Sequence, residues 1–247
     1  MDWSTCLSQA APAHLAGTLL RLVESQEQVA TNQLVSSLER QSVLEDLLEQ
    51  TKPPLHPETE GLHYLLATPF RYPPLQWGSR FGSRREPSLF YGSLGLSTLL
   101  WESAYYRLVF WYGMKTPPTG KLDTQHTLFG AAYQTHAGLR LQEAPFNAHE
   151  AALTDPADYR ASQALGHLLR ERGVEAFEFV SARDPERGLN AALYTPRVFT
   201  RRQPEYQEAW LGEVDGERVR FRAVHGKTVH DFPKAAFLVD GRLPHPA

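Results

Sequence analysis

Cysteine is almost absent from the sequence, because Cys6 is the single one among 247 residues. One cysteine excludes an intrachain disulfide and any metal site built from several cysteines. Its place close to the end of the chain, where termini fray, also makes Cys6 a poor candidate for a catalytic nucleophile. The cysteine content fits a protein of a reducing compartment.

Long apolar runs and an excess of positive charge are missing as well. No stretch approaches the roughly 20 apolar residues that a membrane helix needs. The first residues, MDWSTCLSQAAPAH, lack the basic region and apolar run of a signal peptide. The formal net charge of -3 argues against general nucleic-acid binding. We therefore expect a cytoplasmic protein that neither enters a membrane nor binds nucleic acid directly.

Common signatures of nucleotide and hydrolytic sites are absent too. The sequence contains no G-x-x-x-x-G-K-[ST] loop and no G-x-G-x-x-G after a strand. In YGSLG the serine is at the wrong position for a nucleophile elbow. The ten histidines never take a zinc-binding spacing, so we expect no metal site. His126 and His136 are interpreted as surface or core histidines.

The composition is ordinary for a soluble protein with one substantial core, at 42% hydrophobic and 21% charged residues. Helical and strand-like segments follow one another without regular alternation, which predicts an α+β fold with a mainly antiparallel sheet. The proline-rich segment TKPPLHPE suggests a boundary. Residues 1–58 are predicted to form a helical extension with a linker. Residues 59–247 form the main domain, with a core at about 62–200 and a C-terminal hairpin at 205–225.

Two helices are expected within residues 13–51, because leucine and valine recur there at helical spacing. The positions are Leu15, Leu19, Leu22 and Val23 in the first helix and Leu34, Val35, Leu38, Leu44, Leu47 and Leu48 in the second. Their apolar face is too narrow for a separate core. We expect this arm to pack on the main domain or to form a homodimer contact, and a simple helical extension is an equally good interpretation.

The main domain begins with LHYLLATPFRY, residues 62–72, which is predicted to be a strand that enters a turn. PSLFYGS follows as a short strand, and residues 97–114 form a buried helix that Ser97 caps. The later elements are strands at 126–141, a helix at 155–173 that ends at Gly173, strands at 174–183 and 190–199, and a hairpin around Asp215 and Gly216.

Glu102 is the most informative single residue, because it lies in the apolar helical segment LLWESAYYRLVF. Burial of a carboxylate costs several kcal/mol unless the group is paired or functional. A structural ion pair, for example with Arg107 or an arginine further upstream, and a functional carboxylate explain the residue equally well.

The segment RYPPLQWGSRFGSRREPSLFYGS, residues 71–93, combines four arginines with aromatic rings. Arg71 precedes a double proline, and Arg80 lies in GSRF, where a glycine lets a ligand approach closely. The planar guanidinium group of arginine suits phosphate binding. Tyr91 can offer a ring face to a flat heterocycle, although a strand tyrosine is more often a core residue. Ser181, at the end of the apolar strand FEFV, is by itself no more than a turn residue.

Several segments resemble, in their order and spacing, the RES-domain family, which includes the toxins of Xre–RES toxin–antitoxin modules. The segments are TPFRY, GSRF, SLFYGS, WESAYYR, YRASQALG, FEFVSAR and GLNAALYTP. The resemblance covers about residues 62–200, and the N-terminal helices are typical of a long form of the family. Two local departures are Phe81, where the family usually has tryptophan, and Val180, where it often has proline.

The resemblance implies an ADP-ribosyltransferase-like fold and assigns roles to particular residues. The residues implied as catalytic are Arg71, Glu102 and Ser181. The residues implied as substrate-binding are Tyr72, Arg80, Tyr91 and Asn190.

The implied activity is the cleavage of NAD+, which would be a substrate and not a bound cofactor. Some family members use inorganic phosphate as co-substrate and act as NAD+ phosphorylases, whereas others are hydrolases or ADP-ribosyltransferases that modify a protein. The implied protein partner is an Xre-type antitoxin. A non-catalytic module that binds a nucleotide or a partner protein is the alternative from another class.

Overall fold

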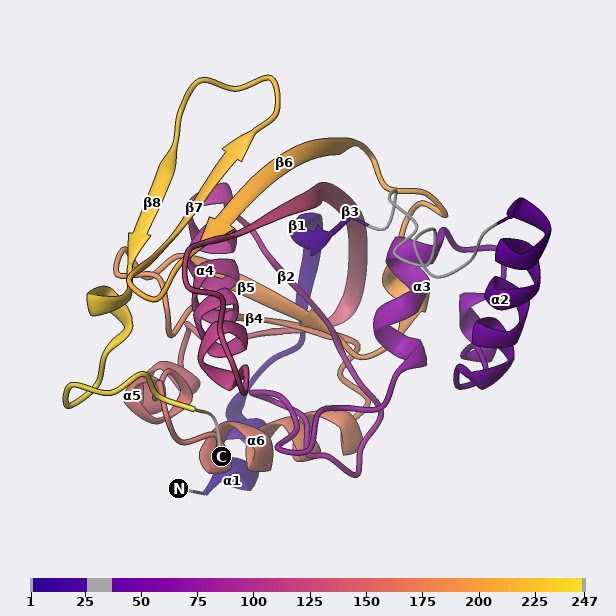
Figure 1. Ribbon diagram of the computed structural model, residues 1–247. Helices are drawn as coiled ribbons and strands as arrows, with labels where there is room; N and C mark the ends of the chain where they lie inside the picture. Colours follow the sequence, from indigo (N-terminus) through magenta and orange to yellow (C-terminus); the bar gives the residue numbers. More distant parts are fainter. Residues whose placement is uncertain (1, 26–36, 246–247) are drawn as a thin grey trace.

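An eight-stranded sheet forms the centre of the molecule, and helices cover it (Figure 1). The computed structural model describes residues 2–25 and 37–245. The strands are β1 (Ala13–Glu24), β2 (Phe90–Ser93), β3 (Leu122–Arg140), β4 (Ala176–Val180), β5 (Leu189–Leu193), β6 (Gln207–Val214), β7 (Arg218–Ala223) and β8 (His230–Pro233). The α-helices are α1 (Trp3–Gln9), α2 (Leu38–Thr51), α3 (Tyr64–Arg71), α4 (Leu96–Gly113), α5 (Glu150–Leu153) and α6 (Arg160–Glu171). The predicted α+β class is confirmed.

Five of the strands close into a ring. β1 pairs with both β2 and β3, and the order continues from β2 through β5 and β4 back to β3. The short contact between β3 and β4 is parallel, whereas the other strand pairs of the described residues are antiparallel. β6, β7 and β8 continue the sheet outward from β3. The ring places the N-terminal strand next to β2, although the two are far apart in the sequence.

The first predicted helix is wrong, because residues 13–24 form β1. Leu15 and Leu19 are fully buried in the sheet. Their spacing of four residues fits one turn of a helix and also two repeats of a strand, so the leucines alone do not separate the two structures. Antiparallel pairing with β3 along almost the whole length of β1 decides in favour of the strand.

The second predicted helix is confirmed as α2 from residue 38 onward. The Oγ atom of Ser37 caps it by accepting a hydrogen bond from the backbone N–H of Arg40 at 3.3 Å. Leu34 and Val35, on which part of this prediction rested, lie outside the described residues. The division of the chain at residue 58 stays a prediction, although β1 places the first part of the chain within the central sheet.

The strand predicted at residues 62–72 is wrong, because residues 64–71 form α3. The Nδ1 atom of His63 accepts a hydrogen bond from the backbone N–H of Leu65 at 3.3 Å and caps this helix. A short apolar run without alternation fits a buried helix as well as a buried strand. The backbone N–H of Ala67 donates to the carbonyl oxygen of His63 at 3.1 Å, which is the hydrogen bond of a helix. Arg71 therefore lies at a helix end and not in a strand.

α4 is the buried central helix that the sequence predicts. Leu100 and Leu108 have no exposed surface. The predicted cap is wrong, because the N-cap residue is Gly95 and not Ser97, and no side chain caps this end. Tyr106 is partly exposed on the surface of α4, so the helix is not buried on every side. The strands predicted between residues 126 and 183 and the helix before Gly173 are also confirmed, as β3, β4 and α6. The strand predicted at 190–199 is confirmed in its first part as β5, whereas residues 196–198 form a short 3₁₀ helix.

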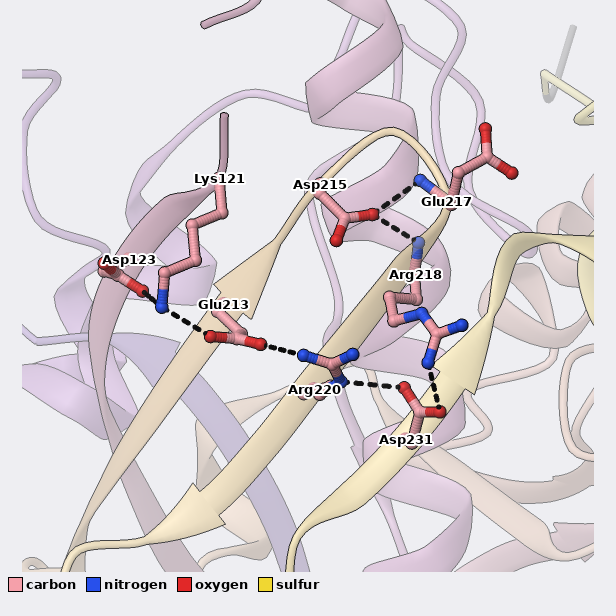
Figure 2. A network of polar contacts seen from close by, with 8 residues as sticks. All are labelled: Lys121, Asp123, Glu213, Asp215, Glu217, Arg218, Arg220 and Asp231. Atoms are coloured by element: carbon pink, nitrogen blue, oxygen red, sulfur yellow. Dashed lines mark hydrogen bonds and ion pairs between the residues drawn. The ribbon is translucent and has the colours of Figure 1, made fainter. Parts of the chain in front are cut away.

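Charged side chains connect the outer strands of the sheet around the predicted hairpin, which is confirmed as β6 and β7 (Figure 2). Glu213 of β6 pairs with Lys121 at 2.7 Å and also with Arg220 of β7. Asp231 of β8 pairs with Arg218 at 3.1 Å and with Arg220 at 3.3 Å. The pairs are partly exposed, so each stabilises the sheet only slightly. Charges at the edge strand also disfavour the addition of a further strand from another molecule.

Gly166 of α6 lies where a side chain does not fit, because an added Cβ atom would lie 1.9 Å from the carbonyl oxygen of Phe81. We expect Gly166→Ala to lower the free energy of unfolding by about 3 kcal/mol, which corresponds to a drop of about 6–12 °C in Tm. Thermal denaturation measures this change. Gly113→Ala is the control, because no atom lies within 4 Å of its added Cβ. An unchanged Tm for Gly166→Ala would contradict the close packing of α6.

Candidate functional site

A cavity of about 670 Å³ lies beside α3 and α4 and over strands β1, β2 and β5. Its volume is within the range of small-molecule sites. The residues that line it include Arg21, Tyr64, Tyr91, Glu102, Tyr106 and Asn190. Side chains from the N-terminal strand, two helices and the central strands therefore meet at one place.

Glu102 reaches the cavity from the second turn of α4. Its Oε1 atom accepts hydrogen bonds from Oγ of Ser181 at 2.6 Å and from Nδ2 of Asn190 at 2.7 Å. No hydrogen bond from the described residues reaches Oε2, so this oxygen is available to a ligand. The structural ion pair with Arg107 is not formed, because Arg107 pairs with Glu24 at 3.0 Å. The geometry therefore favours the functional carboxylate over the ion pair.

The other hydrogen bonds of Ser181 and Asn190 determine which of their atoms donate. Oγ of Ser181 accepts from two backbone N–H groups of the following turn, both at 3.1 Å, so its proton is left for Glu102. Oδ1 of Asn190 accepts from Oγ of Ser93 at 2.6 Å, which turns Nδ2 toward Glu102. Ser181 and Asn190 are both buried. The carboxylate is thus held by a fixed pair of donors before any ligand binds.

Tyr91 lines the cavity from β2, and its hydroxyl group is bound within the protein. The hydroxyl oxygen accepts from the backbone N–H of Phe81 at 3.1 Å and lies 2.9 Å from Oγ of Ser79. Burial raises the pKa of Tyr91 to about 12, so the phenol is neutral at physiological pH. The hydroxyl group ties β2 to the loop that carries Arg80, and the ring is the part that a ligand can contact.

Arg80 is almost fully buried at the wall of the cavity. Its Nη1 atom donates to the carbonyl oxygens of Leu153 at 3.1 Å and Asp155 at 2.9 Å. The guanidinium carbon lies 4.3 Å from the ring centroid of Tyr159. No carboxylate pairs with Arg80 among the described residues, so its positive charge is available to an anion in the cavity.

Arg71 does not line the cavity that holds Glu102. Its Nε atom donates to the carbonyl oxygen of Pro53 at 2.6 Å, and Nη1 pairs with Glu49 at 2.7 Å. It faces a second cavity, between α2 and α3. Tyr72, the next residue, lines both cavities. The catalytic role implied for Arg71 stays a prediction that the position of its side chain does not support.

Arg21 is a residue that sequence reasoning missed. Its Nη1 atom donates to the carbonyl oxygen of Tyr91 at 2.7 Å, and its guanidinium carbon lies 4.6 Å from the ring centroid of Phe90. Burial lowers the pKa of Arg21 to about 10, which still leaves it charged at neutral pH. No carboxylate pairs with it among the described residues. A partly buried cation without a counter-ion is unfavourable, and it is therefore a ready partner for an anionic ligand.

Tyr106 is the second residue that was missed. It follows Glu102 by one helical turn, so the two side chains lie on the same side of α4, and both line the cavity. The ring of Tyr106 is partly exposed, but desolvation of its hydroxyl group by the surrounding protein raises the pKa of Tyr106 above its ordinary value, and the negative charge of Glu102 adds to this effect. The sequence did contain a signal for Tyr106, because it follows Glu102 by four residues and therefore lies on the same side of a helix.

His126 gives the stability of the protein a pH dependence. It is buried on β3, and burial lowers its pKa to about 4, with a further contribution from the charge of Arg107. In the unfolded chain the pKa is about 6.5, so the unfolded state binds more protons between pH 6.5 and 4. Stability therefore decreases as the pH falls through this window. The shift corresponds to about 3 kcal/mol.

We expect His126→Gln to lose this part of the pH dependence. Urea denaturation at pH 7 and at pH 4.5 measures the free energy of unfolding of both proteins. The difference between the two pH values should be smaller in the variant by about 2 kcal/mol, since pH 4.5 covers most of the window. Equal differences would show that His126 is not held neutral by burial.

In residues 2–25 and 37–245, no group of three or more His, Cys, Asp or Glu side chains is placed to hold a metal ion. No helix in this described part is long and apolar enough to cross a membrane.

The fold and the site together define an α+β protein with a small-molecule cavity, an oriented carboxylate and arginines without counter-ions. A family model for the RES domain matches residues 56–213, and the chain belongs to the RES-domain family. The comparison with curated proteins gives no match. The matched part contains Arg80, Glu102, Ser181 and Asn190, whereas Arg21 precedes it.

Proposed function

We propose that this protein is an enzyme that degrades NAD+ by cleaving the bond between nicotinamide and C1′ of the ribose. The observation that carries the proposal is the geometry of Glu102, whose Oε1 is held by Ser181 and Asn190 while Oε2 has no protein donor among the described residues. Membership in the RES-domain family supports the same activity.

Glu102 acts on the charge that develops during cleavage. The C1′–N bond breaks, neutral nicotinamide leaves with the bonding electrons, and the ribose takes on oxocarbenium character. Oε2 of Glu102 stabilises this positive charge, and the low dielectric of the cavity strengthens the interaction. Ser181 and Asn190 keep the carboxylate in place, so little reorganisation is needed. An oxygen of inorganic phosphate or water then bonds to C1′, and the proton of the acceptor is released to solvent.

The arginines and Tyr91 position the substrate in this scheme. Arg21 and Arg80 bind the diphosphate of NAD+, because both carry charge that no carboxylate of the described residues neutralises. In a phosphorylase one of them also orients inorganic phosphate. The ring of Tyr91 packs against the nicotinamide or its ribose.

Nicotinamide release, followed by NMR with and without inorganic phosphate, tests the proposal. Release that requires phosphate and yields ADP-ribose-1″-phosphate establishes a phosphorylase, and release without phosphate establishes a hydrolase. Transfer of labelled ADP-ribose to a protein would instead favour an ADP-ribosyltransferase. Binding of NAD+ without nicotinamide release would contradict the proposal and favour a non-catalytic binding module.

We also propose a biological role, as the toxin of a toxin–antitoxin pair in the cytoplasm, with an Xre-type protein as the partner. The RES-domain membership supports this role, since the family includes such toxins. Growth of cells that express the chain alone, compared with cells that express Glu102→Gln, tests it, and equal growth would contradict it.

A further inference from the structure

Two tyrosine rings belong to the α3 wall, which is the part of the cavity lined by α3 and by residues 72–75. The family resemblance implies that Tyr72 binds substrate, but neither ring has a role in the mechanism described so far. Tyr64 is the first residue of α3, and Tyr72 directly follows the helix. Both line the cavity, although 49% of Tyr64 and 40% of Tyr72 is exposed. Rings this exposed contribute little to the core. At the wall of a cavity they are typical contacts for a flat ligand.

α3 holds the two rings on one side. Tyr64, Thr68 and Tyr72 are spaced by four residues, which places them along the same side of the helix. All three line the main cavity. A rise of about 1.5 Å per residue separates the two tyrosines by about 12 Å along the helix axis. The α3 wall is therefore an extended aromatic surface and not a single ring.

The position of this wall is fixed relative to β2. Phe70 of α3 lies 6.2 Å from Phe90 of β2, measured between ring centroids. Oγ of Ser88 donates to the carbonyl oxygen of Tyr72 at 2.7 Å. Figure 1 shows α3 beside the sheet and α4 on another part of it, and both helices contact β2. The α3 wall and Glu102 thus belong to one framework.

The chemistry of the wall indicates an uncharged, flat group. Besides the tyrosines it contains Pro73, Pro74 and Leu75, which are apolar. Arg71, the residue before Tyr72, does not line this cavity and is paired with Glu49. A phosphate therefore has no unpaired positive charge from α3 itself at this wall, whereas an uncharged heterocyclic base can pack on its aromatic and apolar side chains.

From these observations we propose that Tyr64 and Tyr72 form the subsite for the adenine base of NAD+. The inference rests on the proposed function, in which Glu102 acts at the nicotinamide ribose and Arg21 and Arg80 bind the diphosphate. The adenosine is the remaining part of the dinucleotide. The α3 wall then makes the protein select a dinucleotide over a nicotinamide mononucleotide.

Steady-state kinetics of Tyr64→Ala, Tyr72→Ala and the double variant, with NAD+ and with nicotinamide mononucleotide, test this subsite. Stacking of a base on an aromatic ring contributes about 1–3 kcal/mol, which corresponds to about a 5- to 150-fold change. We expect KM for NAD+ to rise by at least about fivefold in each single variant, with kcat nearly unchanged. KM for the mononucleotide should stay the same. Tyr112→Ala is the matched control, because Tyr112 is 44% exposed and does not line the cavity.

Two kinetic results would overturn the inference: an unchanged KM for NAD+, or an equal rise for both substrates. Calorimetry with ADP-ribose gives a readout that does not need turnover. If the wild type releases no nicotinamide, the proposed function fails. Weaker binding of ADP-ribose to the double variant would then still support the adenosine subsite. Equal or absent binding would overturn it.

Discussion

Glu102→Gln should remove nearly all nicotinamide release while the fold stays intact. Glutamine has the shape of glutamate, and its Oε1 can still accept the hydrogen bonds of Ser181 and Asn190. The second terminal atom, however, becomes an NH₂ group. A partial positive charge then points at the developing ribose cation where the carboxylate oxygen was. Loss of one preorganised electrostatic contact typically lowers kcat by about 10²–10³-fold, and we expect at least this effect.

The measurement is kcat for nicotinamide release, with Tm as the test of folding. Glu178→Gln is a matched control, because Glu178 is a buried carboxylate that does not line the cavity. Its carboxylate oxygens accept hydrogen bonds from the hydroxyl group of Tyr133 at 3.3 Å and from Nε2 of Gln142 at 3.1 Å. This control should lower Tm and leave kcat unchanged. Full activity in Glu102→Gln would show that the carboxylate has no part in the chemistry.

Arg21→Met should lower kcat/KM for NAD+ by about 10- to 150-fold, whereas Arg71→Met should change it by less than about threefold. A hydrogen bond to a charged group contributes about 1.5–3 kcal/mol, which gives the first range. Arg21 lies in the cavity with a charge that no carboxylate of the described residues pairs, and Arg71 is bound by Glu49 and Pro53 outside it. Methionine keeps much of the apolar stem, so both variants remove the charge with little loss of volume.

This pair of variants decides between two assignments of the substrate-binding arginine. The resemblance to the RES-domain family implied a role at the site for Arg71, as a catalytic residue, whereas the geometry of the cavity favours Arg21. Removal of a partly buried, unpaired cation also relieves a desolvation penalty, so Arg21→Met should fold at least as well as the wild type. A larger loss in Arg71→Met than in Arg21→Met would reverse our assignment.

The residues that surround Glu102 could be named from the sequence because their segments, taken together, resemble the RES-domain family, although Ser181 alone carried no signal. A carboxylate in an apolar helix, a serine at a strand end and an asparagine in the following strand keep a recognisable order along the chain. Their convergence on one carboxylate oxygen is a property of the strand pairing, which places Asn190 opposite Ser93. The order could be read from the sequence, but the distances could not.

The two wrong elements have a common physical cause. Residues 13–24 and 64–71 are apolar segments whose spacing fits a helix and a strand almost equally well. Local propensity does not decide such cases, and partners distant in the sequence do. Residues 13–24 form a strand because they pair with β3. Residues 64–71 form a helix that packs against β2. Arg21 was missed because residues 13–24 were predicted to be a helix, whereas its side chain reaches the cavity from strand β1.

The ring of strands also has a consequence for the order in which the protein is made. The hydrogen bonds that build the site join residues separated by 70, 79 and 88 positions in the chain. A ribosome adds about 5–20 residues per second, so Glu102 is synthesised roughly 4–18 seconds before Asn190. During this time Arg21 and Glu102 have been synthesised, but β5, which carries Asn190, has not. Under the proposed function, an incomplete nascent chain cannot consume NAD+, and the activity begins only when nearly the whole polypeptide has left the ribosome.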